Sequence, residues 1–434
     1  MKYIITTLGC KVNQYETQAM ETMLQERGHA PAAEGERADA VIINTCAVTA
    51  ESGRKSRQAV RHLETAHPEA AVVVCGCWSQ ISADEAKEIG ADVVFGSGDK
   101  HELVDAIEKA VADKQTAENT SVTEQIDDPF HRNLFEELPA GAVAGRTRAM
   151  LKIEDGCLNF CTYCVIPFTR GRVRSLPLEA AARQAKQLQD EGYRELVITG
   201  IEIASYGSDL PGKPNLADCV EAIAAAAPEI RLRLGSLEPT VITEDFARRI
   251  AATGRVCPHF HLSLQSGCDK TLKNMNRKYD TARFYQCVEV LEKYFPGCAF
   301  TADLITGFPG ETLEDQAETL EFIRKCRFSD MHIFPYSVRP GTKAEKMPGQ
   351  VTKNEKARRA HEAQKVADEM HRTYMENCVG KTIEVLFETH DGNLWHGHGA
   401  NYCTVVAEGE NLRGLVKNVK ISGISGENLV GEVI

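Results

Sequence analysis

Three cysteines stand close together in the middle of the chain, at Cys157, Cys161 and Cys164. Cysteine thiolates hold iron–sulfur clusters, and three of them around a [4Fe–4S] cluster leave the last iron open to another molecule. Zinc is the main alternative, but structural zinc usually takes four protein ligands in paired short spacings. A disulfide is a weaker interpretation because the number of thiols is odd. The spacing therefore favours a cluster that performs chemistry as well as storing electrons.

A second set of three cysteines is spread along the N-terminal part of the chain, at Cys10, Cys46 and Cys77. Each follows a short apolar run that predicts a strand. The three runs are Tyr3–Leu8, Ala40–Asn44 and Ala71–Val74. Parallel strands end at one edge of a sheet, so we expect the thiols to meet there; the alternative is three unrelated cysteines in turns. Strand alternation predicts that Cys75 and Cys77 point the same way, and we assign Cys77 to the site because it lies past the strand end.

The composition is that of a globular protein without a membrane span. The chain of 434 residues is too long for one ordinary domain, and it contains no apolar run of roughly 18 residues and no signal-peptide pattern at its start. These features favour the cytoplasm, where thiols stay reduced, so the fifteen cysteines are not a disulfide framework. Cys219, Cys287 and Cys326 fall in helical apolar patterns and are predicted core thiols. The net charge of −12 argues against nucleic-acid binding through overall charge, although it is compatible with a local basic surface.

The pattern of elements divides the chain into four segments of an α/β protein. Residues 1–115 alternate strands with helices, at Glu16–Arg27 and Gly53–Ala66, which predicts a parallel-sheet α/β domain. Residues 116–147 are polar and irregular and form a predicted linker. Residues 148–375 repeat a strand–helix rhythm six times, which predicts a partial (βα)6 barrel. The six strands are Ala149–Ile153, Glu195–Thr199, Arg231–Leu234, His259–Leu264, Ala299–Ile305 and Asp330–Phe334.

The C-terminal segment, 376–434, predicts a small β-barrel of OB-like size that follows a charged helix at Lys353–Met375. Its predicted strands are Thr382–Phe387, Thr404–Ala407, Gly414–Ile421 and Asn428–Val433. Barrels of this kind often bind nucleic acid. Residues 380–434 nevertheless carry four Lys/Arg against seven Asp/Glu, so charge does not mark this barrel as an RNA surface.

The chain resembles the radical S-adenosylmethionine (SAM) methylthiotransferases of the MiaB/RimO type. The Cys157-x3-Cys161-x2-Cys164 motif, with Tyr163 before its last cysteine, is similar to the radical SAM signature. Nearly the whole chain shares the resemblance, and its tail resembles the family's TRAM domain. Further matching stretches are Thr7–Asn13, Asn44–Val48, Gly76-Cys77, His261–Gly267, Met275–Tyr279, Gly307–Thr312 and Pro335–Thr342. Two segments, Leu8–Glu16 and His332–Ser337, are most similar to the MtaB branch, which acts on N6-threonylcarbamoyladenosine at position 37 of tRNA.

The resemblance implies a transferase that replaces the hydrogen on C2 of that adenine with a methylthio group. It implies two [4Fe–4S] clusters and SAM as cofactors, because the carbon is unreactive in ordinary polar chemistry. Cys157, Cys161 and Cys164 would hold the cluster that binds SAM and, after receiving one electron, generates a 5′-deoxyadenosyl radical. Cys10, Cys46 and Cys77 would hold an auxiliary cluster that handles the sulfur, and a second SAM would supply the methyl group. The implied partners are the anticodon loop of tRNA and an unidentified one-electron donor, with no membrane.

Supporting residues follow from their positions after the strands. The resemblance gives Tyr163 a backbone contact with the adenine of SAM, and it makes Gly200, Ser236, Glu238 and Gln265 candidates for holding SAM. Turn or capping roles are the alternative for each of them. Arg277 and Arg339 are candidates for pairing with a carboxylate or phosphate. Predicted RNA contacts lie beside the cysteine motifs, at Arg54, Lys55, Arg57, Arg61, Arg170, Arg172 and Arg174, where the alternative is a solvated charged face.

Two other activities stay open at this point. The first is closely related: it is the same methylthiolation of a different substrate, either an isopentenyl-type adenosine of tRNA or an aspartate of a ribosomal protein. A non-enzymatic iron–sulfur protein that binds RNA or transfers electrons is the alternative from another class. The glycine-rich and polar loops after five of the strands argue against the second alternative, because they form a ligand-binding rim.

Overall fold

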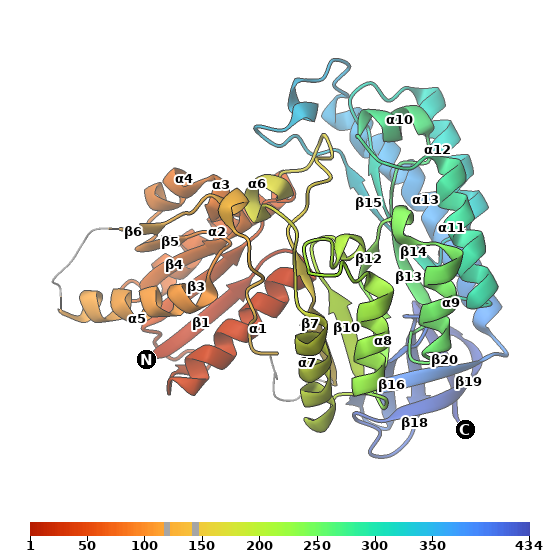
Figure 1. The fold of residues 1–434 in the computed structure, drawn as a ribbon, viewed down its shortest axis with the longest axis horizontal. Coiled ribbons are helices and arrows are strands. Elements are labelled where there is room, and N and C mark those ends of the chain that lie inside the picture. The colour runs from red at the N-terminus through yellow and green to blue at the C-terminus, as the bar shows by residue number, and fades with distance from the viewer. Residues whose placement is uncertain (117–121, 141–146) are drawn as a thin grey trace.

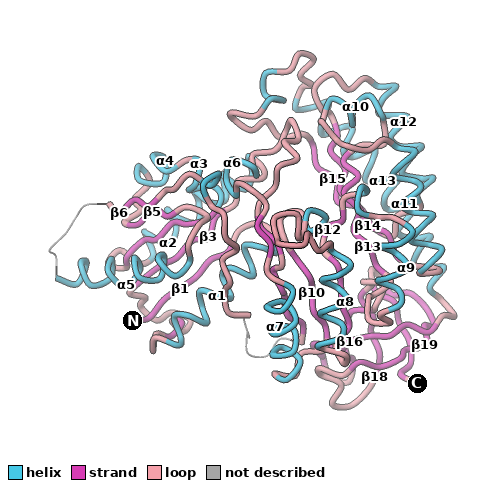
Figure 2. The backbone as a smooth tube through the Cα atoms, in the orientation of Figure 1, coloured by secondary structure: helices cyan, strands magenta, loops and turns pink. Residues whose placement is uncertain are grey.

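The sequence folds into three connected bodies, which a computed structural model describes for residues 1–116, 122–140 and 147–434 (Figure 1). Parts of the predicted linker, at 117–121 and 141–146, lie outside the described residues. Figure 2 shows the N-terminal sheet on one side of the strands of the central body, with the C-terminal strands beneath them. None of the described helices combines the length and apolar character needed to cross a bilayer.

The N-terminal body is a six-stranded parallel sheet in the order β2-β1-β3-β4-β5-β6. Its strands are β1 (Lys2–Thr7), β2 (Ala30–Pro31), β3 (Ala40–Thr45), β4 (Ala71–Gly76), β5 (Val93–Phe95) and β6 (Thr123–Gln125). Its helices are α1 (Lys11–Glu26), α2 (Ala50–Ala66), α3 (Cys77–Ile81), α4 (Ala83–Glu88) and α5 (Lys100–Thr116). Strands β3 and β4 are buried along their whole length, as expected for a parallel sheet covered on both faces. Strand β6 comes from the predicted linker, so this sheet continues past residue 115.

The central body is an open barrel of parallel strands with helices outside. Its two hydrogen-bonded sheets have the orders β11-β10-β7 and β12-β13-β14-β15. The strands are β7 (Arg148–Lys152), β10 (Glu195–Thr199), β11 (Arg231–Leu234), β12 (Ser236–Leu237), β13 (His259–Gln265), β14 (Ala299–Thr306) and β15 (Asp330–Pro335), with a short antiparallel pair β8 (Glu154–Asp155) and β9 (Arg174–Ser175). The helices are α6 (Ile166–Arg170), α7 (Leu178–Asp190), α8 (Leu216–Ala226), α9 (Glu244–Ala252), α10 (Asp269–Asn274), α11 (Thr281–Tyr294), α12 (Leu313–Cys326) and α13 (Lys353–Cys378). All six predicted strands are present, and Cys219, Cys287 and Cys326 are buried as predicted.

The C-terminal body is a closed five-stranded barrel in the order β16-β17-β18-β20-β19. The strands are β16 (Thr382–Asp391), β17 (Leu394–Gly399), β18 (Thr404–Glu408), β19 (Val416–Ser425) and β20 (Asn428–Val433). Strand β17 was not predicted because its residues, Leu-Trp-His-Gly-His-Gly, are mostly polar or glycine. The strand forms because Trp395 faces the barrel core while its neighbours face outward.

Buried charge attaches the C-terminal barrel to the central body. Arg231 and Arg233 on β11 both pair with the buried carboxylate of Glu195, at 2.7 and 2.8 Å. Their remaining N–H groups donate to backbone carbonyls of the C-terminal barrel, including those of His398 at 2.8 Å and Ala400 at 3.0 Å. Burial opposes ionisation of Glu195, but the two guanidinium groups outweigh it and lower its pKa to about 2. The ion pairs thus fix the barrel against the end of the sheet that lies opposite the cysteine loops (Figure 1).

Candidate active site

The loop that carries Cys157, Cys161 and Cys164 lies at the carboxyl end of the central strands. All three cysteines line one cavity of about 270 Å³. Backbone N–H groups point at two of the sulfurs, with Asn159 N 3.5 Å from the Sγ of Cys157 and Ile166 N 3.4 Å from the Sγ of Cys164. The loop is therefore shaped to present three sulfurs to one space, as the sequence predicted.

Charged side chains from three other elements surround these thiols. The Nη1 of Arg277 donates to the Sγ of Cys161 at 3.2 Å. The Nδ2 of Asn159 donates to two carboxylates, at 2.7 Å to Glu238 and 3.3 Å to Glu202. Burial, together with the nearby Glu238, raises the pKa of Glu202 to about 8. The cavity therefore has hydrogen-bonding acidic groups on one side and a cation beside the sulfurs, which suits a ligand with both amino and hydroxyl groups.

Only some of the predicted SAM-binding residues line this cavity. Tyr163 and Gln265 line the cavity. Glu238 lies behind it as the partner of Asn159. Gly200 lies where a side chain does not fit, because a Cβ there would be 2.8 Å from the Oε2 of Glu154. Ser236 is exposed and does not line this cavity.

Asn159 and Glu202 are site residues that the sequence did not predict. Asn159 lies inside the cysteine motif, and Glu202 directly follows the Gly200-Ile201 turn. In the sequence, only their positions next to predicted site residues could have indicated a role in the site. Neither has a type or spacing that indicates a ligand contact, so only the fold shows that they line the cavity together.

The three N-terminal cysteines meet at the carboxyl edge of the parallel sheet. Register pairs Asn44 of β3 with Cys75 of β4, so the strand ends are level. Cys77 and Cys10 lie near enough to Cys46 to help raise the pKa of its thiol, and Cys77 acts in the same way on Cys10. Gly9 permits this approach: its φ is +108°, and a Cβ there would lie 2.8 Å from the Sγ of Cys46.

One asparagine joins the first two cysteine loops. The Nδ2 of Asn13 donates to the carbonyl of Leu8 at 2.8 Å and to that of Thr45 at 2.9 Å. These carbonyls lie just before Cys10 and Cys46. Asn13 therefore sets the spacing between the two loops, and its position in the first loop explains the Cys10-Lys-Val-Asn13 spacing.

Cys75 and Cys77 do not point the same way. Cys75 packs in the core on the α1 and α5 side of the sheet, whereas Cys77 packs in the core on the α2 side. Gly76 has φ +101°, so the extended strand ends there and alternation no longer applies. The prediction from alternation is wrong for this reason. Cys77, the first residue of α3, lies past the strand end as predicted, while burial raises the pKa of the Cys75 thiol to about 12.

Arg170 connects the two cysteine sites. Its Nε donates to the Sγ of Cys77 at 3.3 Å, and its Nη2 donates to Asn13 and Glu16, each at 3.0 Å. It belongs to α6, directly after the loop of the other three cysteines. Val165, next to Cys164, packs in the same core cluster as Cys77, so the two cysteine loops lie beside each other.

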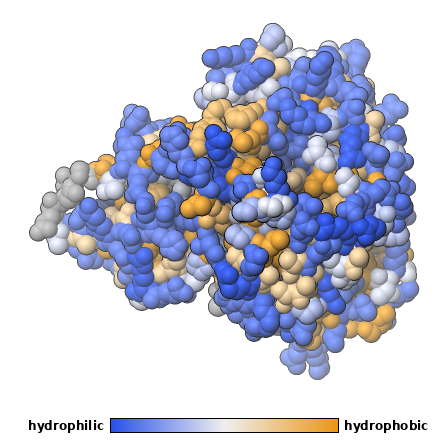
Figure 3. Space-filling model, viewed as in Figure 1, coloured by the Kyte–Doolittle hydropathy of each residue, from blue (hydrophilic) through white to orange (hydrophobic). Residues whose placement is uncertain are grey.

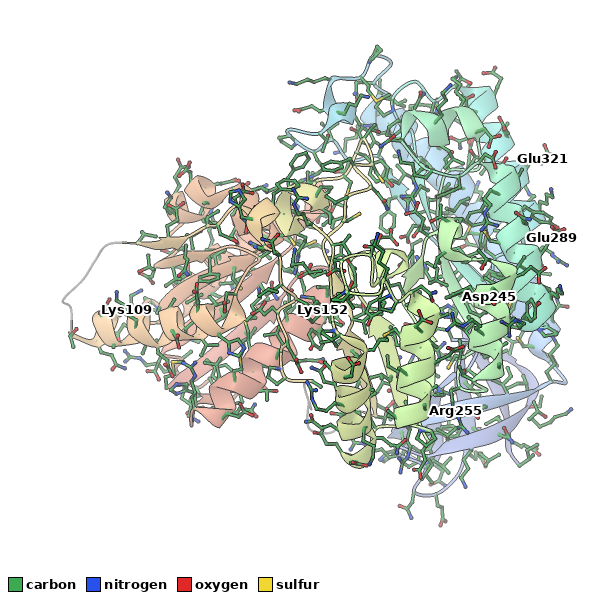
Figure 4. All side chains as sticks on the ribbon, viewed as in Figure 1. Lys109, Lys152, Asp245, Arg255, Glu289 and Glu321 are labelled. Carbon is green, nitrogen blue, oxygen red and sulfur yellow. The ribbon has the colours of Figure 1, made fainter. Side chains whose placement is uncertain are left out.

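A buried ionic network surrounds Arg170 at the contact between the N-terminal and central bodies. Glu16 of α1 accepts from Arg170 and, at 3.0 Å, from the Nζ of Lys152. Lys152 also pairs with Asp155 at 2.8 Å. Lys152 lies in the middle of the molecule, on the side of the barrel nearest the N-terminal sheet (Figure 4). Burial opposes ionisation of Glu16, but Arg170, Lys100 and Lys152 lower its pKa well below the usual range.

These contacts correct part of the predicted RNA surface. Arg170 is fully buried, and Arg174 is nearly so, with its Nη1 donating to backbone carbonyls. Contact with RNA phosphates does not fit either side chain in this structure, because neither reaches the surface. Arg172 remains exposed, with its Nε on the carbonyl of Phe130 at 3.2 Å.

The other predicted RNA contacts lie on α2. Lys55 and Arg61 are exposed. Arg54 forms a surface ion pair with Glu51, and its Nε lies 2.8 Å from that carboxylate. Arg57 is half-buried beside Glu85, at 3.2 Å. A role in RNA binding stays a prediction for these residues and for Arg172.

Both donor sets fit iron–sulfur clusters. Burial raises the pKa of the Cys46 thiol to about 11 and that of Cys164 to about 12, so ionised sulfur at these positions requires a positive group such as bound iron. Each set also has a guanidinium that donates to a ligand sulfur, Arg170 in one and Arg277 in the other. Hydrogen bonds of this kind are a recognised means of tuning clusters.

Comparison with known proteins places the chain in a family. Residues 151–323 match the Radical SAM superfamily, and residues 2–96 match Uncharacterized protein family UPF0004. The chain is 37% identical over 423 residues to the threonylcarbamoyladenosine tRNA methylthiotransferase MtaB of Bacillus subtilis, covering 96% of this chain and 92% of that protein. The protein belongs to the radical SAM methylthiotransferase family. It is therefore an enzyme that uses SAM and [4Fe–4S] clusters.

Other relatives share this full-length similarity. The MtaB of Thermotoga maritima is 36% identical, with 88% of this chain and 86% of that protein covered. A tRNA-2-methylthio-N(6)-dimethylallyladenosine synthase of Pelotomaculum thermopropionicum is 33% identical, with 99% and 97% covered. Among solved structures, the radical SAM methyltransferase TsrM of Kitasatospora setae, with cobalamin and a [4Fe–4S] cluster bound, has a similar fold, with a TM-score of 0.56 at 14% identity over 90% of this chain and 81% of that one.

Proposed function

We propose that this methylthiotransferase acts on N6-threonylcarbamoyladenosine at position 37 of tRNA and converts C2–H into C2–SCH3. The observation that carries the proposal is that the two three-thiol sites lie side by side, with Val165 of one loop packed in the same core cluster as Cys77 of the other. Full-length similarity to proteins named for that substrate supports it. One site suits radical generation, and the other suits sulfur transfer. A [4Fe–4S] cluster that only transfers electrons usually has four cysteine ligands, whereas each site here offers three.

The chain's own residues hold and orient the reactants. When bound, the two clusters and SAM supply the radical, the sulfur and the methyl group. Cys157, Cys161 and Cys164 hold one cluster at the cavity, where Tyr163 and Gln265 form part of the SAM-binding wall. The other three cysteines, Cys10, Cys46 and Cys77, hold the auxiliary cluster.

The N-terminal body completes the cavity. Val48 and Thr49, which follow Cys46, line the same space as the SAM-type cysteines. Ser337 lines it from the opposite loop and accepts a hydrogen bond from the N–H of Ala50 at 2.9 Å. A base that enters here lies between the two cysteine sites, as direct sulfur transfer to its ring requires.

The anticodon loop of tRNA is the proposed RNA partner, because it carries position 37. An unidentified one-electron donor is the second proposed partner, and the cytoplasm is the proposed compartment because the substrate is tRNA. The exposed residues Lys55, Arg61 and Arg172 are the proposed phosphate contacts on the rim.

Mass spectrometry of tRNA nucleosides from cells with and without the gene tests the substrate. We expect the methylthio form of threonylcarbamoyladenosine to disappear from the deletion strain and to return with the gene. Loss of a methylthio isopentenyl-type adenosine instead would favour the second candidate substrate, which the similarity to the dimethylallyladenosine synthase supports. Unchanged tRNA with a methylthio group lost from a ribosomal protein would redirect the proposal to an aspartate.

A further inference from the structure

A second cavity lies next to the first, between α2, α3, α6 and the loop after β15. Its volume is about 490 Å³. It is separate from the cavity that the SAM-type cysteines line, since the two share no lining residue.

One wall divides the two cavities. Ser337 lines the first cavity and Val338 the second, and the same switch occurs between Thr49 and Ala50. The hydrogen bond from Ala50 to Ser337 closes this wall. In each of three segments, 48–50, 164–166 and 336–338, adjacent residues line different cavities. The two cavities are therefore neighbours.

Arg339 is an unpaired cation in the second cavity. Its side chain is only 7% exposed, and its Nε is shielded from solvent without a hydrogen-bond partner. No ion pair to its guanidinium occurs within the described part of the chain. Burial lowers its pKa, the nearby Cys46 thiol raises it, and Arg57 lowers it further. A buried guanidinium whose Nε has no hydrogen-bond partner is costly, so this position favours an anion in the second cavity in addition to the Cys46 sulfur nearby.

The remaining lining fits a nucleotide better than a small anion. Arg57 also lines this cavity and pairs with Glu85. The two arginines, Arg57 and Arg339, and the one carboxylate of Glu85 give the lining a net charge of +1. Apolar side chains form the rim, with Phe168 46% and Val338 40% exposed. Figure 3 shows apolar surface around α6, between the N-terminal body and the barrel. Bases stack on exposed aromatic rings of this kind in single-stranded RNA complexes.

We propose that the second cavity binds the nucleotide next to the one that reacts, with its phosphate on Arg339 and Arg57 and its base against Phe168. This rests on the proposed function, in which the first cavity takes the target adenosine. The shared wall then separates two consecutive bases of a splayed loop, which is how single-stranded RNA is commonly recognised. Arg339 thus acts as a positioning residue for the RNA substrate.

Binding of an anticodon-arm hairpin to the reconstituted holoenzyme tests the subsite. Affinity is measured at several salt concentrations for Arg339→Gln, Arg339→Lys and Arg57→Gln, with iron content matched to wild type. We expect Arg339→Gln to weaken binding about tenfold and to reduce the salt slope by about one, as for one lost phosphate contact. Arg339→Lys should restore the slope. Arg248→Gln, which removes an exposed cation paired with Asp245 on α9, is the matched control and should leave binding unchanged.

Hairpins with one neutral methylphosphonate locate the contact. At one position beside the target adenosine, neutralisation should weaken wild-type binding but should not weaken Arg339→Gln binding further. Affinities of Arg339→Gln and Arg57→Gln equal to that of Arg248→Gln would overturn the subsite, as would a change confined to the spectrum of the auxiliary cluster. Wild-type protein must also form the methylthio nucleoside in the same preparation. Absence of that product refutes the proposed function, whereas product formation with unchanged variant affinities refutes the subsite alone.

Discussion

Replacing Glu16 by Gln should loosen the contact between the N-terminal and central bodies. Glu16 is fully buried and accepts hydrogen bonds from both Arg170 and Lys152. The substitution keeps the shape but removes the charge, so two cations remain with Asp155 as the carboxylate they share. Breaking a buried charge pair by removing one partner typically costs about 3–5 kcal/mol.

The expected loss is large enough to measure as faster local opening. Since every ~1.4 kcal/mol is a factor of ten, amide hydrogen exchange in α1 and β7 should accelerate by roughly a hundredfold or more. The matched control is Glu108→Gln, which removes a half-exposed carboxylate that pairs with Arg27 and His29 on the same body. Surface pairs contribute about 0–1 kcal/mol, so the control should change exchange by a few fold at most.

The same variant reports on the auxiliary site. Arg170 contacts both Glu16 and the sulfur of Cys77, so a loosened Arg170 should alter the spectrum of that cluster. Exchange rates of Glu16→Gln equal to those of Glu108→Gln, with an unaltered spectrum, would refute the claim that this network holds the two cysteine sites in register.

Two further predictions concern the thiol pair and the C-terminal barrel. Cys75→Ala should retain both clusters, whereas Cys77→Ala should lose about half of the iron, as iron analysis of the two matched variants will show. Glu195→Gln should be less stable than wild type near neutral pH, because Glu195 stabilises the fold in its charged form. Its folded pKa of about 2 lies below the ordinary value of 4.5, so this contribution is present above pH 4.5 and is lost as the pH falls toward 2. The difference in thermal midpoint between wild type and variant should therefore shrink between pH 6 and pH 3, and a constant difference would contradict the assignment.

The strands and the cysteine sites were predictable because local sequence determines them. Strands such as β3 and β10 are buried on both faces and appear as continuous apolar runs, so their positions follow from the sequence. The strand ends then place the cysteines without knowledge of tertiary contacts. Strand β17 escaped prediction because only Trp395 and one leucine mark it as apolar.

The role of Arg170 was not predictable from its neighbourhood. Three arginines in five residues, from Arg170 to Arg174, are typical of a solvated face. The partner that makes Arg170 a buried residue is Glu16, which lies 154 positions away in the sequence and reaches it only through docking of two bodies. The prediction that Cys75 and Cys77 point the same way was wrong for a local reason. The positive φ of Gly76 ends the strand alternation before Cys77.

The most direct test of the account separates radical generation from sulfur transfer. Reduced, reconstituted protein is incubated with SAM and tRNA that carries threonylcarbamoyladenosine, and 5′-deoxyadenosine and methylthio nucleoside are both quantified by mass spectrometry. Wild type should form both products. A variant with Cys10, Cys46 and Cys77 all replaced by alanine should still form 5′-deoxyadenosine but no methylthio nucleoside. Methylthio product from that variant at the wild-type level would contradict the central claim that these three cysteines hold the cluster that handles sulfur.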